Sequence, residues 1–320
     1  MDRGIERGPA LSWAFGDPDQ RRAWGRYWVD DTISGVLSTA THWLFKLLPI
    51  DACSAVGARL GEEMGRRRYR KRDQRARETY ARLRPDVTDP VEVAAAVVRM
   101  WRNIGRSMLE FSVMRRLHRG DRVAVAGREH IAAARTTGRP RIYLMLHLGA
   151  WELVGPMLLR EGESGRHIYQ PLPNRFERWI ADGVRRPFRH LLIAPGAAGA
   201  REAVRVLTRE KGGMIFGVDE LIRGRVQGPS FGREIRPDSN LFNAARMALL
   251  SDALMLPAYV LRTEGAHFVF HIGEPFPPVR TGDRTADLTA TVAAIDGAIT
   301  SIVRENLDQW LLLHDLRFDT

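Results

Sequence analysis

One short stretch of the sequence combines a histidine and a carboxylate at a spacing that suits acid–base chemistry. His147 ends an apolar run, and Glu152 follows five positions later. On a regular helix these two side chains would point apart, because neighbours on a helix face are three or four residues apart. They can meet only if His147 lies in the turn after a strand and Glu152 in the first turn of a helix. A histidine held by a carboxylate in this way suits general-base catalysis on a hydroxyl group.

The residues on either side of the pair predict the two elements that must position it. Residues 142–146 are apolar throughout and predict a short buried strand. An apolar stripe at helical spacing follows the pair and consists of Leu153, Val154, Met157 and Leu158. We therefore expect a strand-to-helix turn that carries His147 and Glu152.

The rest of the chain predicts an α/β fold. Residues 27–118 have helical patterns with breaks near Pro49, Pro85 and Pro90. From about residue 122, short apolar runs alternate with helical patterns. The expected strands are 141–146, 166–170, 213–218, 254–261 and 267–273. The expected helices are 150–160, 175–188, 197–210, 239–251 and 284–306. This alternation is typical of a central, mostly parallel or mixed sheet flanked by helices.

The sequence indicates one domain over residues 27–320, preceded by an irregular segment at residues 1–26. The first 30 residues contain charges and prolines and lack the continuous apolar core of a secretory signal. A single cysteine, Cys53, excludes an internal disulfide framework and a multi-cysteine zinc site, and fits a reducing compartment. The chain has no Walker loop and no Gly-x-Gly-x-x-Gly segment, so no nucleotide or metal cofactor is expected.

The segment from His147 to Glu152, which contains Gly149 and Trp151, resembles the His-x4-Asp/Glu motif of the membrane glycerolipid acyltransferases. It is most similar to the lipid A biosynthesis branch. Further pieces follow in that family's order, from about Leu37 to the C-terminus. They are residues 169–174, the pair Arg185 and Arg186, residues 212–220, residues 230–232, residues 256–257, and the tail residues Gln309, Trp310, His314, Arg317 and Phe318.

The resemblance implies a membrane-associated acyltransferase with a glycerolipid acyltransferase-like fold. Its donor would be the thioester of an acyl carrier protein, or less readily coenzyme A, and its acceptor the hydroxyl of a lipid A precursor. Another glycolipid or phospholipid acceptor, as in the related phosphatidylinositol mannoside acyltransferases, is the alternative within the same chemistry. In this scheme His147 takes the hydroxyl proton and Glu152 holds the imidazole in the right tautomer. Backbone N–H groups near Gly149, or an arginine, would stabilise the oxyanion by analogy.

The resemblance also implies a set of substrate-binding residues. Arg185 would bind a phosphate of the acceptor or of the carrier's prosthetic arm, and Asp219 and Glu220 would support the acceptor from the end of a strand. Gly149, Trp151 and Asn174 complete the set.

The chain departs from the family pattern at three places where an acceptor head group would be read. Gln170 replaces a usual basic residue, Glu220 replaces a usual Gln, and residues 237–241 replace a Thr-containing stretch.

A net charge of +11 favours an anionic partner. Of the 49 basic residues only Lys46, Lys71 and Lys211 are lysines, and arginine forks match phosphate geometry. Anionic lipid and nucleic acid both satisfy this condition, so the rival class is a non-catalytic basic protein that binds either of them. The acyltransferase motifs favour an anionic membrane surface over nucleic acid.

Residues 33–50 are the best membrane candidate. His42 and Lys46 interrupt them, and they are short against the ~20 apolar residues of a spanning helix. They indicate a helix that lies in the interface or a short anchor, with packing on the protein's own core as the alternative. The basic run at residues 66–72 would add about 1 kcal/mol per residue near acidic head groups. The expected location is the cytoplasmic face of the inner membrane.

Two other patterns are weaker. Residues 228–232 match Gly-x-Ser-x-Gly around Ser230, but the flanking residues predict neither the preceding strand nor the following helix that a nucleophile elbow requires. His267 and His271 share one strand face without a third ligand pattern, so a metal site is not expected there.

Overall fold

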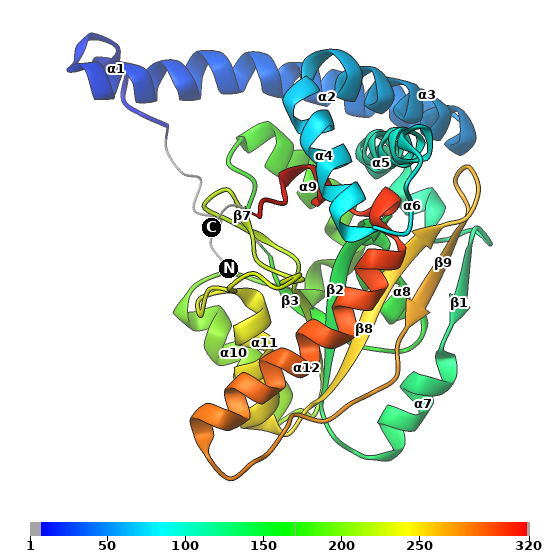
Figure 1. Ribbon diagram of the computed structural model, residues 1–320. Helices are drawn as coiled ribbons and strands as arrows, with labels where there is room; N and C mark the ends of the chain where they lie inside the picture. Colours follow the sequence, from blue (N-terminus) through cyan, green and yellow to red (C-terminus); the bar gives the residue numbers. More distant parts are fainter. Residues whose placement is uncertain (1–7, 170, 319–320) are drawn as a thin grey trace.

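A mixed sheet forms the centre of the computed structural model, which describes residues 8–169 and 171–318 (Figure 1). Within these residues the sheet has seven strands in the order β1-β9-β8-β2-β5-β3-β4. The strands are β1 (Val123–Ala126), β2 (Arg141–Gly149), β3 (Arg166–Ile168), β4 (Leu192–Ile193), β5 (Gly213–Gly217), β8 (Leu254–Arg262) and β9 (Phe268–Ile272). Only β8 and β9 pair antiparallel; the other neighbours are parallel. The fold is therefore α/β with a mixed sheet, as expected.

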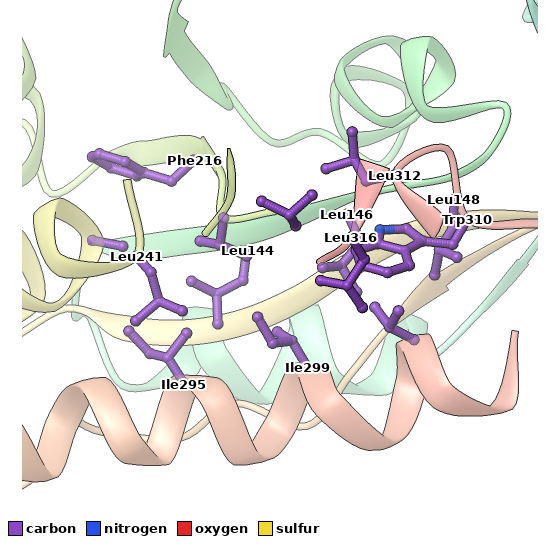
Figure 2. Packing of buried hydrophobic residues seen from close by; sticks show 14 of the residues in the cluster. Leu144, Leu146, Leu148, Phe216, Leu241, Ile295, Ile299, Trp310, Leu312 and Leu316 are labelled. Atoms are coloured by element: carbon purple, nitrogen blue, oxygen red, sulfur yellow. The ribbon is translucent and has the colours of Figure 1, made fainter. Parts of the chain in front are cut away.

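The central strand β2 is apolar on both faces because helices cover both. On one face Leu144, Leu146 and Leu148 are fully buried and pack with Ile295 and Ile299 of α12 (Arg284–Glu305) (Figure 2). Burying each such side chain contributes about 1.5–3 kcal/mol. This packing holds the strand rigidly, so that side chains at its carboxyl end have fixed positions.

The helices of the α/β layer agree with the predicted pattern. They are α7 (Arg128–Thr136), α8 (Val154–Arg160), α9 (Arg175–Arg185), α10 (Ala197–Thr208), α11 (Asn240–Ser251) and α12. Side chains cap three of them, because Asn174, Ser239 and Asp283 accept hydrogen bonds from the first-turn N–H groups of α9, α11 and α12. The sequence did not predict α7, the edge strands β1 and β4, or the hairpin of β6 (Leu221–Ile222) and β7 (Arg225–Val226). All of these are short, so their periodicity is weak.

A helical layer lies over one end of the sheet. It consists of α1 (Pro18–Gly25), α2 (Asp31–Leu47), α3 (Ile50–Glu63), α4 (Arg70–Leu83), α5 (Pro90–Glu110) and α6 (Met114–Leu117). The expectation of an irregular segment at residues 1–26 is wrong for its described part, which contains a 3₁₀ turn at Leu11–Phe15 and then α1. Asp17 and Gln20 form a capping box and Pro18 opens the helix, which explains why α1 forms. Residues 1–7 lie outside the described residues.

The predicted helix at residues 33–50 is α2, which begins at Asp31. It ends at Leu47, and Pro49 precedes α3, because proline removes a donor that a continuing helix would need. In Figure 1, α1, α2 and α3 form a long rod that extends past the sheet. One side of α2 packs inward through His42 and Phe45, while Ile33, Leu37 and other apolar residues are exposed.

A single helix in the described part of the chain is long and apolar enough to cross a membrane, by length and composition alone, and it is α12. It packs against the sheet, where Ile295, Ile299 and Val303 are fully buried. Its apolar character therefore matches core packing.

Candidate active site

His147 lies at the carboxyl end of β2, where the strand loses its regular register. The pairing of β2 with β8 shifts between Met145 and Gly149. Gly149 has a φ of +49°, and a Cβ there would lie 2.4 Å from the backbone oxygen of Val260, so only glycine fits. This corrects two expectations. His147 is inside the strand and not in the turn after it, and Gly149 shapes the strand instead of lining a substrate cavity.

The imidazole of His147 is held by Asp219, not by Glu152. Its Nδ1 lies 2.8 Å from Asp219 Oδ1, and its backbone N–H donates to Oδ2 at 2.7 Å. Trp310 Nε1 also donates to Oδ2, at 2.9 Å, and Asp219 is fully buried. The reason is the sheet itself. Met145 and Gly217 are partners in the parallel pairing of β2 with β5, so the residues two positions further on meet at the same edge.

This arrangement determines which ring nitrogen can accept a proton. Nδ1–H donates to the carboxylate, which leaves Nε2 as the acceptor of the neutral imidazole. Burial lowers the pKa of His147, but the charge of Asp219, its hydrogen bonds and a smaller contribution from Glu152 outweigh that effect. The net result is a pKa raised above the ordinary value of 6.5. The geometry is that of a general base held by a buried acid.

Glu152 pairs with a different residue. It lies in the 3₁₀ turn Trp151–Leu153 that precedes α8, and its carboxylate binds Arg185, the last residue of α9. Arg185 Nη2 is 2.5 Å from Glu152 Oε1, and Nε is 3.3 Å from Oε2. The expectation that Glu152 orients the imidazole is therefore wrong, because Asp219 already occupies Nδ1. Glu152 instead holds a cation beside the histidine.

A cavity of about 700 Å³ brings most of the expected site residues together. They are His147, Trp151, Glu152, Arg185, Asp219 and Glu220. The remaining wall is largely apolar and includes Met145, Ile168, Val184, Phe188 and Ile215. The Trp151 ring lies 5.8 Å from the imidazole ring, centroid to centroid. A cavity of this size, apolar with a few converging polar groups, is typical of a site for a small or lipid-like ligand.

Two other expected residues have mainly structural contacts. Glu220 lines the cavity, but its carboxylate also accepts the N–H of Asn240 at the start of α11, and burial raises its pKa. Asn174 does not line the cavity. Its Oδ1 accepts from Phe176 N at 2.9 Å and its Nδ2 donates to Asp31 O at 2.9 Å, so it caps α9 and ties it to α2. The expectation that Asn174 binds substrate is therefore not supported by its position. Gln170 lies outside the described residues.

The sequence did not identify His167 or the role of Trp310. His167 is on β3 and lines the cavity, and its buried Nδ1 has no hydrogen-bond partner in the described part of the chain. Burial lowers its pKa to about 4, so the ring is neutral at ordinary pH. A lone histidine in a short strand has no motif to mark it, and Trp310 reaches Asp219 only because the C-terminal tail folds back on the sheet.

Comparisons with known proteins found a matching family model and a similar solved structure. A family model described as bacterial lipid A biosynthesis acyltransferase matches residues 24–319. No curated protein matches the chain. Among solved structures, the 1-acyl-sn-glycerophosphate (LPA) acyltransferase PlsC from Thermotoga maritima is similar, with 15% sequence identity and a TM-score of 0.37. That match covers 85% of this chain and 97% of the other.

Proposed function

This chain belongs to the bacterial lipid A biosynthesis acyltransferase family, and we propose that it transfers a fatty acyl group from acyl carrier protein to a hydroxyl of a lipid A precursor. The observation that supports this reaction best is the position of His147, whose Nδ1 is held by a buried carboxylate while the ring faces a largely apolar cavity. Membership of the family makes the rival interpretation, a basic binding protein without catalysis, unnecessary.

In the proposed reaction His147 acts as a general base. As the acceptor hydroxyl oxygen attacks the thioester carbonyl carbon, its proton moves to Nε2, and Asp219 stabilises the imidazolium that forms. When the carbon–sulfur bond breaks, the departing thiolate takes this proton and leaves as a thiol. The acyl group goes directly to the acceptor, so no covalent acyl-enzyme is required.

Arg185 supplies positive charge to the same cavity. Glu152 holds its guanidinium through two contacts, and both side chains are only partly exposed. A fixed guanidinium suits a phosphate of the acceptor or of the carrier's prosthetic arm, because its donors match two phosphate oxygens. This role assigns Glu152 and Arg185 to binding, and His147 and Asp219 to proton transfer.

We propose a location at the cytoplasmic face of the inner membrane, and the exposed apolar face of the helical layer supports contact with a bilayer. Exposed apolar residues lie along α2, including Ile33, Leu37, Leu44 and Leu47, at the helical spacing of one face. The α1–α3 rod extends beyond the sheet (Figure 1), so this face can lie in the interface without moving the core.

Lipid mass spectrometry of cells with and without the gene tests the proposal. We expect loss of one acyl chain from a lipid A species, restored by wild type and by the control His267→Ala, an exposed histidine outside the cavity. His147→Ala should fail to restore it while its thermal unfolding stays like that of wild type. Loss from another glycolipid or phospholipid would identify the alternative acceptor. An unchanged lipidome, or rescue by His147→Ala, would contradict the proposal.

A further inference from the structure

A second cavity of about 650 Å³ lies between α2, α6 and α9. We call it the α2–α6–α9 cavity, and its wall includes Trp43, Lys46, Arg115, Arg116, Arg119 and Trp179. It has Val184 in common with the cavity at His147, so the two lie next to each other across α9. None of the catalytic groups described above lines it.

The charges in this cavity are unbalanced. Among the residues that the structure describes, its wall contains four cationic side chains and no carboxylate. Arg116 has a structural role, because its Nη2 donates hydrogen bonds to the backbone oxygens of Lys46 and Leu48. Lys46 lies over the Trp43 ring, 4.2 Å from its centroid. Within the described residues Lys46, Arg115 and Arg119 have no carboxylate in ion-pair contact, so their charge is available to an anion.

The rim of the cavity is apolar and exposed. In its wall, Trp43 is 48% exposed and Trp179 58%, and at neighbouring positions of α2 Leu44 is 60% and Leu47 80% exposed. A free phosphate or a soluble cofactor would leave these side chains in water. A phosphate attached to acyl chains would use both features, since its oxygens match lysine and arginine donors and its chains cover the rim. Tryptophan beside cationic residues is also typical of a membrane–water interface.

We propose that the α2–α6–α9 cavity binds the phosphate of an anionic membrane lipid whose acyl chains lie against Trp43, Leu44, Leu47 and Trp179. The site is separate from the cavity at His147 and does not depend on which lipid is acylated. A head group bound there would fix one end of α2 and α9 at the bilayer surface.

Sedimentation of the full-length protein with vesicles tests the site. The vesicles are phosphatidylcholine alone or with about one-third phosphatidylglycerol. Arg115→Gln/Arg119→Gln removes two exposed cations of the cavity. Arg201→Gln/Arg209→Gln removes the same charge from exposed positions in α10 and at its C-cap, at the opposite end of the molecule from α2 (Figure 1). We expect the cavity variant to bind the anionic vesicles about 30-fold more weakly, and the control to bind like wild type. Equal losses in both variants would show a net-charge effect and overturn the proposal.

Two further measurements distinguish binding of a whole lipid from binding of free phosphate. The rim variant Trp179→Ser changes one exposed wall side chain on α9, outside the apolar face of α2, and should also weaken binding. Inorganic phosphate should not displace the vesicles more than chloride does at equal ionic strength. Unchanged binding by the rim variant would show that the rim does not contact acyl chains. Selective displacement by phosphate would show a site for free phosphate. Either outcome would contradict the lipid assignment. Thermal unfolding curves that match wild type confirm that each variant is folded.

Discussion

The imidazole of His147 and the carboxylate of Asp219 lie 2.8 Å apart, although 72 residues separate them in the sequence. They meet because β2 and β5 are parallel neighbours. Met145 pairs with Gly217, and His147 and Asp219 each lie two residues further along the chain. The histidine is thus supported by the sheet edge, and the nearby Glu152 is available to bind Arg185.

The pH dependence of acyl transfer follows from the raised pKa of His147. A general base must be neutral to accept a proton, so kcat/KM should fall as pH decreases through a value above 6.5. The effect of the same pKa shift on stability has the opposite sign. The raised pKa of His147 adds fully to the free energy of unfolding at pH values below the pKa of the unfolded state, and this contribution is lost as pH rises through the pKa of the folded state. Initial rates across the pH range measure the first effect, and a rate independent of pH on the acid side would contradict it.

Asp219→Asn should lower kcat by about 10²–10⁴-fold, because an amide no longer favours the imidazolium and can hold the wrong tautomer. It should also move the acid limb of the pH profile to lower pH, since Asp219 is the main group that raises the pKa of His147. A merely structural role would leave that limb in place. Asp252→Asn, at an exposed position with a φ of +56° that asparagine tolerates, is the matched control.

Glu152→Gln should move the acid limb less than Asp219→Asn does, because Glu152 contributes less to the pKa of His147. Its main effect should be on KM, since it releases Arg185 from a fixed position. Steady-state kinetics on both variants distinguish the two carboxylates. If Glu152→Gln lowered kcat and shifted the limb as much as Asp219→Asn, Glu152 would be the residue that supports the histidine.

A buried ion pair ties the helical layer to the sheet. Arg262 of β8 makes two contacts with Glu110 of α5, at 2.7 and 2.8 Å, and their side chains are 6% and 2% exposed. Glu110→Gln leaves a buried guanidinium without its counter-charge and should cost about 3–5 kcal/mol of unfolding free energy. Glu62→Gln, which breaks the exposed pair with Arg102, should cost less than about 1 kcal/mol. Urea unfolding measures both, and similar losses would contradict the burial argument.

Helices α3 and α5 approach closely through glycines. A Cβ at Gly61 would lie 2.2 Å from the backbone oxygen of Trp101, so Gly61→Ala must push the helices apart and should cost about 1–3 kcal/mol. Gly183 in α9 has open space around its Cβ position. Gly183→Ala should therefore be neutral or stabilise by up to about 1 kcal/mol. Thermal unfolding compares the two, and equal effects would show that close packing does not decide the outcome.

Much of the fold and the family of this protein could be predicted from local sequence. The apolar run before His147 and the stripe after Glu152 predicted the strand and the helix, because periodicity is a property of neighbouring residues. The alternating pattern also predicted the α/β class, and the ordered motifs predicted the acyltransferase family that matches the chain. The donor, the acceptor and the roles of the site residues stay predictions.

Tertiary structure alone decided which residues meet. Asp219 reaches His147 through the pairing of β2 with β5, and Trp310 reaches Asp219 through the return of the C-terminal tail; neither contact is encoded by spacing along the chain. The same holds for the hydrogen bond from Asn174 to Asp31 of α2, and for the α2–α6–α9 cavity, whose walls come from three separate helices. A sequence pattern describes how one element folds, whereas contacts between elements depend on how the whole chain packs.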